Sequence, residues 1–270
     1  MTSTITVRNL SFALSEKTPH YWYEGHPGKT HLMNALSSVF PEGEAFFVRS
    51  VQYYRDRVDD PKLQAEIRAF AGQEGVHSRE HDRHVQLLVD QGYTMVLKMN
   101  ELEAGATRSL NRHLPLFALA STAALEHLTA ILARRALAEP HYWMDAMHED
   151  MAAMWQWHAM EESEHKAVAF DVLQIVSSSY WLRVLAMSEA TFGLLTATFV
   201  RWGYFMYRDG LLTDRRQWVD TFRFLWSRDG LFRRLIPDYL RWFRRDFHPE
   251  ERDDRPLIDA CRRRLATLLA

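Results

Sequence analysis

Apolar residues recur with the 3.6-residue period of an α-helix along nearly the whole chain, and strand-like alternation is scarce. Proline, glycine and Asp-Gly pairs divide this pattern into separate helical segments. The segments are expected at residues 41–58, 60–91, 99–113, 115–139, 142–177, 180–208, 214–227, 231–245 and 256–269. The first begins at Pro41, because proline suits the first turn of a helix. The pattern therefore predicts an all-α protein.

These helices are expected to form one domain over residues 1–270, because no low-complexity linker divides them. Residues 1–28 mix short apolar pieces with proline and glycine, which predicts an irregular lead-in. Residues 29–177 are expected to form a four-helix core that holds two metal ions, for the reasons given below. Residues 178–270 are expected to be accessory C-terminal helices packed around that core.

The composition excludes several classes of protein. Hydrophobic residues make up 47% of the 270 residues and charged residues 25%, as in a soluble globular protein with a sizeable core. The single cysteine, Cys261, excludes a disulfide framework and any cysteine-based metal site, and it fits a reducing, cytoplasmic setting. The first residues, MTSTITVRNLSFAL, lack the pattern of a secretory signal, so none is expected.

The chain gives little support for a membrane or a nucleic acid as a partner. The apolar region 180–207 has at most 11 uncharged residues in a row, fewer than the roughly 20 that a spanning helix needs. From Tyr180 onward, 17 arginines accompany 12 acidic residues and several aromatic ones. A solvated basic face is the preferred interpretation, with peripheral contact to anionic lipid as the alternative. No nucleic-acid-binding module is recognisable, so no such partner is expected.

Two helical segments carry the sequence Glu-x-x-His. The motifs are Glu74-Gly75-Val76-His77 and Glu162-Ser163-Glu164-His165. Residues three apart share one face of a helix, so both side chains of a motif can reach the same metal ion. With 18 glutamates and 13 histidines, about one such spacing is expected by chance, so the motifs need support from their surroundings.

That support comes from a further glutamate upstream of each motif. Glu44 lies 30 residues before Glu74, and Glu126 lies 36 residues before Glu162, both among apolar neighbours where an unpaired carboxylate would be costly to bury. Four helices that supply four carboxylates and two imidazoles form the ligand set of di-iron and di-manganese carboxylate bundles. The predicted metal ligands are Glu44, Glu74, His77, Glu126, Glu162 and His165.

The order and spacing of these residues resemble the ferritin-like di-metal carboxylate superfamily. The whole chain also resembles a bacterial family described as predicted metal-dependent hydrolases. The segments that carry this resemblance are Asn34-Ala35-Leu36-Ser37, Phe40-Pro41-Glu42-Gly43-Glu44-Ala45-Phe46-Phe47, Gln73-Glu74-Gly75-Val76-His77, Ala124-Leu125-Glu126-His127, Glu161-Glu162-Ser163-Glu164-His165-Lys166 and Phe247-His248-Pro249. The resemblance implies a ferritin-like four-helix bundle with additional C-terminal helices.

A further histidine lies on the face of the second motif. His158 precedes Glu162 by four residues, so His158, Glu162 and His165 share one stripe of the helix. The pattern resembles the fourth helix of di-iron arylamine N-oxygenases, which implies that His158 is a third nitrogen ligand. A hydrogen-bonded core histidine is the alternative.

Oxygen and nitrogen ligands without cysteine suit iron or manganese, with zinc as a further option, and we expect two ions, iron first. Gln73 and Glu161 directly precede the motif glutamates and are candidates to orient the outer nitrogens of the histidines. Asp171 is a further candidate for this role. A solvated or salt-bridged role is the alternative for each.

The expected reaction is activation of dioxygen to oxidise a small apolar organic substrate. This ligand set activates dioxygen in the superfamily that the chain resembles, and a dry pocket is expected from Phe46, Phe47, Met151, Met154, Trp155, Trp157 and Met160. An external electron donor would be required, because no flavin, nicotinamide or iron–sulfur motif is present. Hydrolysis at the same ligands is the alternative. A non-enzymatic iron-binding protein is a more remote one, and homo-oligomerisation stays open.

One competing motif overlaps the first Glu-x-x-His. His77-Ser78-Arg79-Glu80-His81 matches the His-x-x-Glu-His signature of a zinc peptidase, in which Glu80 would activate water. That interpretation leaves Glu44, Glu126 and the second motif without a role, so the bundle is preferred. His81 and His84 are otherwise expected at the surface or behind the ligands.

Overall fold

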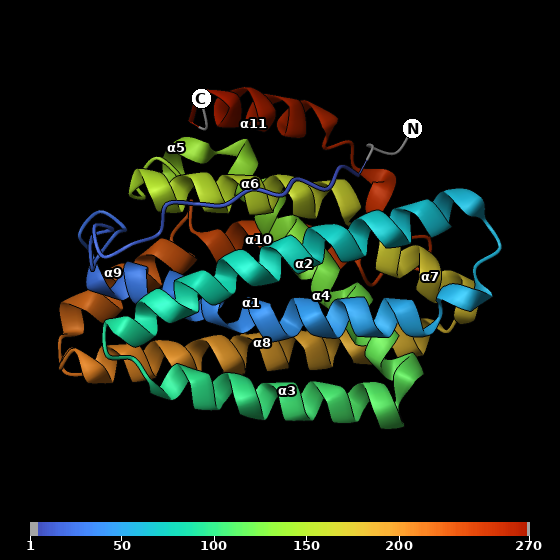
Figure 1. Cartoon of the computed structure of the whole chain (residues 1–270), viewed down its shortest axis with the longest axis horizontal. Coiled ribbons are helices and arrows are strands. Elements are labelled where there is room, and N and C mark those ends of the chain that lie inside the picture. The colour runs from blue at the N-terminus through green and yellow to red at the C-terminus, as the bar shows by residue number, and fades with distance from the viewer. Residues whose placement is uncertain (1–4, 269–270) are drawn as a thin grey trace.

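The computed structural model describes residues 5–268, and within them the chain forms eleven α-helices and two short 3₁₀ helices (Figure 1). Helices make up 76% of the structure and no strand is found in this described part, which confirms the predicted all-α class. The helix count is consistent with a ferritin-like bundle. The elements are α1 (Pro27–Tyr53), η1 (Arg55–Arg57), α2 (Pro61–Asp90), α3 (Met95–His113), α4 (Pro115–Ala138), α5 (Pro140–Trp143), α6 (Glu149–His165), α7 (Val168–Val176), α8 (Tyr180–Arg208), α9 (Arg215–Trp226), α10 (Leu231–Arg241), η2 (Pro249–Glu251) and α11 (Arg255–Leu268).

Helix α1 differs from the prediction, which had its first turn at Pro41. The helix begins at Pro27, where the ring of His26 accepts a hydrogen bond from the backbone N–H of Lys29. Pro41 lies inside the helix, and its carbonyl accepts a hydrogen bond from the Ser78 hydroxyl of α2. A proline in a helix interior removes one backbone hydrogen bond. Burial of nearly all residues before Pro41 against the other helices outweighs this local cost.

The segment predicted as one helix over residues 142–177 is divided into α5, α6 and α7. Helix α6 ends at His165, and α7 begins at Val168. At the break, the buried ammonium of Lys166 donates to Asp254 Oδ2 at 2.6 Å and to the carbonyl of Arg252 at 2.7 Å. This contact with the C-terminal region satisfies a charge that a continuous helix buried on all sides would leave without a partner.

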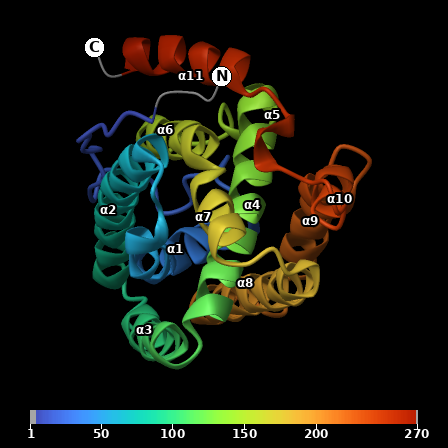
Figure 2. The same cartoon turned by 90° about the vertical axis from the view of Figure 1, so that its right-hand side faces the viewer.

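Four helices surround the site described below. Helix α1 packs against α2 and α4, and α4 packs against α6 and α8. In the end-on view of Figure 2, α2 and α4 lie on opposite sides of α1, and α6 lies above them. Helix α11 covers the outer face of α6 (Figure 1), where the Cys261 thiol donates to the carbonyl of Gln156.

Helix α4 occupies the middle of the bundle. Within the described residues it is the one helix long and apolar enough to cross a membrane, and 78% of its most apolar window is buried inside the molecule. Such burial is typical of the central helix of a soluble protein.

We predict that Asp254→Ala lowers the free energy of unfolding by about 3–5 kcal/mol, because it leaves the buried charge of Lys166 without its partner. Urea denaturation measures the change. The control is Asp259→Ala, which removes the exposed ion pair with Arg262 and is expected to cost less than about 1 kcal/mol. Equal losses in the two variants would show that the buried pair does not stabilise the break between α6 and α7.

Candidate metal centre

Four helices bring the predicted ligands together in the middle of the bundle. Helix α1 supplies Glu44, α2 supplies Glu74 and His77, α4 supplies Glu126, and α6 supplies His158, Glu162 and His165. Each of these seven side chains belongs to a residue that is no more than 3% exposed. The structure therefore collects four carboxylates and three imidazoles in a space closed to bulk water.

Glu74 and Glu162 lie between the two motif histidines. Nδ1 of His77 is 3.8 Å from Oε2 of Glu74 and 3.7 Å from Oε1 of Glu162. Nε2 of His165 is 3.1 Å from Oε1 of Glu74 and 3.7 Å from Oε1 of Glu162. Glu126 approaches His165 alone, with Oε2 at 3.4 Å from the same nitrogen.

These distances define overlapping groups of atoms that could hold a metal ion. One group is Glu44, Glu74 and His77, and another is Glu74, Glu162 and His165. Within each group the ligand atoms all lie within 4.8 Å of one another. Glu74 belongs to both of these groups.

The outer nitrogens of the two histidines are held in a reciprocal way. Nε2 of His77, on α2, lies 3.1 Å from Oε2 of Glu161 on α6. Nδ1 of His165, on α6, lies 2.9 Å from Oε1 of Gln73 on α2. Each histidine is thus held by the residue that directly precedes the glutamate of the opposite motif. The hydrogen bonds leave Nδ1 of His77 and Nε2 of His165 facing the carboxylates.

Two arginines from outside the four helices form ion pairs with the carboxylates behind the histidines. The guanidinium of Arg8 donates to Glu161 at 2.8 Å and to Glu164 at 2.7 Å, and Arg262 of α11 donates to Glu164 at 2.7 Å. Gln73 also donates to Glu164, at 2.9 Å. Sequence reasoning missed Arg8 and Glu164, because neither has a motif spacing that connects an irregular segment to the site.

His158 faces the cluster and begins a chain of hydrogen bonds that leads away from it. Its Nε2 lies 3.1 Å from Oε1 of Glu162, and its Nδ1 lies 2.7 Å from Nε2 of His81. The Ser37 hydroxyl lies 2.7 Å from Nδ1 of His81 and 2.7 Å from Nδ1 of His84. Both His81 and His84 are buried, so the surface position considered for them is wrong. In the sequence, His77, His81 and His84 are spaced so that they share one face of α2, and this spacing could have indicated that all three are buried.

The carboxyl groups of the cluster are in unequal states. Burial raises the pKa of Glu44 well above its ordinary range, and the charge of Glu74 raises it further. Burial also raises the pKa of Glu126 well above that range. Burial would raise the pKa of Glu162 too, but the neighbouring His165 holds it well below the ordinary range. Unequal pKa values of this kind are expected where several carboxyls share a small buried space.

The histidines balance part of this charge. Burial alone would lower the pKa of His77, but its contacts with Glu161 and Glu74 raise it to about 10. The pKa of His165 is likewise raised, against the effect of burial, by Glu126 and Glu162. Protonated imidazoles thus occupy positions where a cation is electrostatically favoured.

Two sequence candidates lie away from the cluster. Glu80 accepts hydrogen bonds from Arg79, Arg83 and the backbone N–H of Phe12, so it faces the lead-in and does not reach the site as the zinc-peptidase motif requires. Asp171 contacts His248 at 2.8 Å. Asp171 lies on α7, beyond the break after α6, so it does not share a continuous helix with His165.

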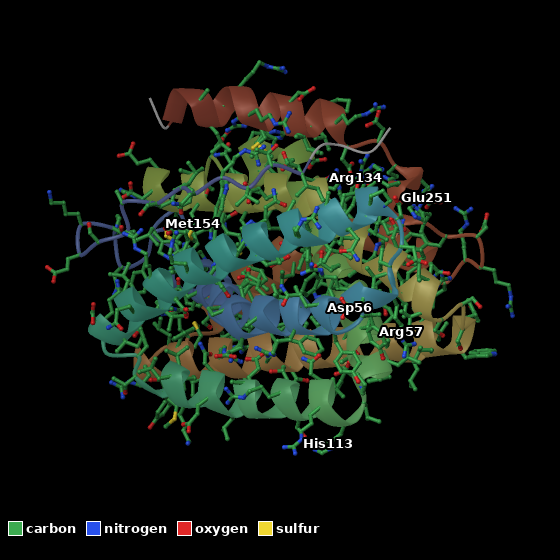
Figure 3. All side chains as sticks on the ribbon, turned by 45° about the vertical axis from the view of Figure 1, so that its right-hand side comes forward. Asp56, Arg57, His113, Arg134, Met154 and Glu251 are labelled. Carbon is green, nitrogen blue, oxygen red and sulfur yellow. The ribbon has the colours of Figure 1, made fainter. Side chains whose placement is uncertain are left out.

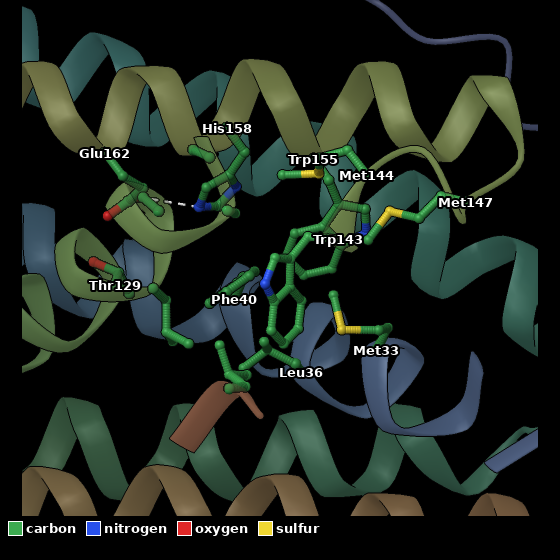
Figure 4. Close-up of a pocket in the computed structure, with 15 residues that line it drawn as sticks. Met33, Leu36, Phe40, Thr129, Trp143, Met144, Met147, Trp155, His158 and Glu162 are labelled. Atoms are coloured by element: carbon green, nitrogen blue, oxygen red, sulfur yellow. Dashed lines mark ion pairs between the residues drawn. The ribbon is translucent and has the colours of Figure 1, made fainter. Parts of the chain in front are cut away.

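A narrow cavity of about 70 Å³ reaches the cluster at His158 and Glu162. Figure 4 shows these two residues at one end and Met144 and Met147 toward the other. The remaining lining is apolar except for Thr129 and the indole nitrogens of two tryptophans: Met33, Leu36, Phe40, Thr129, Leu132, Ala133, Ala136, Trp143, Trp155, Ala159 and Leu231. Of the seven residues expected to line a dry pocket, Trp155 does so here. The others were chosen for their closeness to the motifs in sequence, whereas the cavity extends from the cluster toward α5.

Comparison with known proteins adds one match. A family described as predicted metal-dependent hydrolase matches residues 6–253, nearly the whole chain. No curated protein and no solved structure matches the chain. The buried glutamate and histidine groups agree with the metal dependence that the family description states. The chain belongs to this family of predicted metal-dependent hydrolases.

Proposed function

We propose that this protein is an enzyme that binds two metal ions between α1, α2, α4 and α6 and uses them to hydrolyse a small, largely apolar substrate. One observation carries the proposal. Both carboxylate oxygens of Glu44, Glu74 and Glu126 are buried without a hydrogen-bond partner, and so are Nδ1 of His77 and Nε2 of His165. Folded proteins leave very few buried polar atoms unpaired, so such a concentration at one point is typical of a ligand site.

A second group of similar composition lacks this feature. His20, His31 and Asp209 also place potential ligand atoms within 4.8 Å of one another. There, however, the carboxylate of Asp209 accepts hydrogen bonds from the hydroxyls of Tyr21 and Tyr93 at 2.9 and 2.7 Å. Its oxygens are satisfied by the protein, which favours a structural role for that group.

The positions of these buried atoms without hydrogen-bond partners support a division of the ligands between two ions. Glu44 and Nδ1 of His77 would hold one ion, and Glu126 and Nε2 of His165 the other. Glu74 and Glu162 lie between the histidines and would bridge the pair. His158 would complete the set through Nε2, because its Nδ1 is engaged by His81. Such oxygen and nitrogen donors suit iron or manganese, and zinc also accepts them.

Hydrolysis is the reaction that the family match supports. A bound pair of divalent ions supplies a Lewis acid and an activated water at neutral pH. The chain contributes a cavity lined almost wholly by hydrocarbon, which excludes bulk water from the reacting groups. Trp143 and Trp155 line this cavity, and their buried indole N–H groups have no hydrogen-bond partner. They are donors for a carbonyl oxygen, so we propose an ester or amide with an apolar body.

Oxidation with dioxygen is the second candidate. The observation that favours oxidation is the set of donor residues, which comprises four glutamates and the two motif histidines. This set lies beside an apolar cavity. Carboxylate-rich pairs of this kind serve di-iron proteins. This reaction would also need an external electron donor.

Metal content tests the site directly. Elemental analysis of the purified protein is expected to find about two ions per chain, and Glu44→Ala and His165→Ala to lower that number by half or more. Matched controls are Glu42→Ala on the same helix α1 and His113→Ala, whose exposed side chain projects from the end of α3 (Figure 3). Unchanged metal content in both ligand variants would overturn the assignment.

Stability of the metal-free protein gives an independent check on Glu126. Its pKa is raised in the folded state by burial, so its contribution to stability is fullest below the unfolded pKa and is lost as the pH rises through the folded value. Glu126→Gln cannot show this loss. The free energy of unfolding of the variant should therefore increase relative to that of the wild type between pH 5 and pH 8, by up to about 1.4 kcal/mol per pH unit. Urea denaturation at the two pH values measures both free energies of unfolding. A difference between variant and wild type that stays the same at pH 5 and pH 8 would contradict the prediction.

Activity assays separate the two reactions. We expect the metal-loaded protein to hydrolyse apolar esters or amides at the same rate with and without dioxygen, and Glu162→Ala to lower that rate at least 100-fold. Product formation is followed by chromatography, and dioxygen by an electrode in the presence of a chemical reductant. Dioxygen uptake coupled to oxidation of an apolar compound, without hydrolysis, would replace the hydrolase proposal by the second candidate.

A further inference from the structure

We propose that a groove between α4, α8, α9 and α10 binds an unbranched aliphatic chain and leads it to the metal centre. The identity of the reacting end rests on the proposed function, whereas binding of the chain rests on the groove alone. The groove has a volume of about 530 Å³, within the range of small-molecule sites. In Figure 2, α9 and α10 lie on the α4 and α8 side of the molecule.

The lining of the groove is hydrocarbon and aromatic except for two hydroxyl groups, and it has no charged side chain. It comprises Leu128, Ile131, Leu132, Thr191, Leu194, Leu195, Phe199, Phe222, Trp226, Phe232, Leu235, Ile236 and Tyr239. Its two hydroxyl groups are engaged with each other, since Thr191 donates to the Tyr239 oxygen at 3.2 Å. A sugar, a nucleotide or an extended peptide would find too few partners for its polar groups here.

The groove adjoins the narrow cavity at the metal centre. Leu132 of α4 lines both of them. On α10, Leu231 lines the cavity and its neighbour Phe232 lines the groove. The two spaces therefore meet at Leu132, and the proposed ligand would pass this side chain to reach the cavity that holds His158 and Glu162.

The small volume of the inner cavity restricts the shape of the ligand. Its volume of about 70 Å³ is roughly half that of an engineered cavity of about 150 Å³ that accepts benzene. A ring does not fit that space, whereas a polymethylene chain with a small carbonyl group does. Trp143 and Trp155 offer their N–H groups to that carbonyl.

The mouth of the groove is also apolar. Leu195, Phe222, Trp226 and Ile236 line it and are exposed by 37–52%. Exposed apolar rims mark ligand-binding grooves and protein interfaces alike. Continuity with the cavity at the metal centre favours a ligand that enters the molecule over a partner that covers its surface.

Straight-chain alcohols from butanol to dodecanol are the probes, titrated into the full-length protein by calorimetry. The affinity is expected to rise about fourfold for each added methylene until the groove and cavity are filled, and then to level off. Leu132→Trp should move this plateau to shorter chains, because it closes the passage between the groove and the cavity. A plateau at the same length in Leu132→Trp would overturn the passage to the metal centre.

Two exposed leucines of α8 provide a matched pair. Leu195, 37% exposed, lines the groove, whereas Leu185, 61% exposed, does not. Leu195→Glu is expected to weaken dodecanol binding at least tenfold, and Leu185→Glu less than twofold. Phe222→Glu on α9 repeats the test should Leu195→Glu not fold, as judged by circular dichroism. Equal losses at Leu195 and Leu185 would show adsorption to the surface and overturn the site.

Two further outcomes are decisive. Absence of alcohol binding in the folded wild type would overturn the proposal, as would a dimer in sedimentation equilibrium that Leu195→Glu dissociates, since a second copy would then occupy the groove. The titrations are run with metal-loaded and metal-free protein. If alcohol binds but elemental analysis finds no metal taken up by the protein, the groove is established and the proposed hydrolase is wrong, so the two failures are distinguishable.

Discussion

The burial of four carboxylates at one point is the constraint on which the rest of this structure depends. Removing a single charge from water costs several kcal/mol unless a partner compensates it. Here Glu44 and Glu126 have raised pKa values, His77 and His165 are drawn toward their protonated forms, and the carboxylate oxygens of three glutamates accept no hydrogen bond. Such a cluster would be selected against in a purely structural core, where hydrocarbon packs at lower cost. A cation resolves the conflict, because it allows the carboxylates to ionise and gives their oxygens a partner.

The surrounding helices are arranged to hold this cluster rigid. Gln73 and Glu161 cross between α2 and α6 to fix the histidines, so each motif depends on the other for its orientation. Arg8 then ties Glu161 to the lead-in segment, which extends the support beyond the four helices. Since outer contacts of this kind set the orientation and basicity of metal ligands, a substitution at Arg8 acts on the site through Glu161 and His77, without reaching it directly.

The sequence was sufficient for the all-α class and for the residues that meet in the cluster, because helical periodicity and the Glu-x-x-His spacing are local properties. It was insufficient where the outcome depends on tertiary contacts. Pro41 has the local properties of a first-turn residue, yet the burial of the residues before it extends α1 back to Pro27. At the break, Lys166 pairs with Asp254, which lies 88 residues away and which no local pattern connects to it. Glu80 fits the spacing of the zinc-peptidase motif, yet it accepts a hydrogen bond from the backbone N–H of Phe12 instead. Asp171, whose spacing already placed it off the ligand face, contacts His248.

The division of α5, α6 and α7 also bears on how such a bundle acquires a substrate site. The segment divides at residues 144–148 and again at residues 166–167. At the first division, Trp143 and Met144 line the cavity that also contains His158. The accessory helices α8, α9 and α10 then add walls outside α4 that the four core helices do not contain. In this arrangement the candidate metal ligands belong to α1, α2, α4 and α6, and three of these helices also supply most of the cavity lining. Most of the groove lining comes instead from α8, α9 and α10, so the cavity and the groove are built from different parts of the chain.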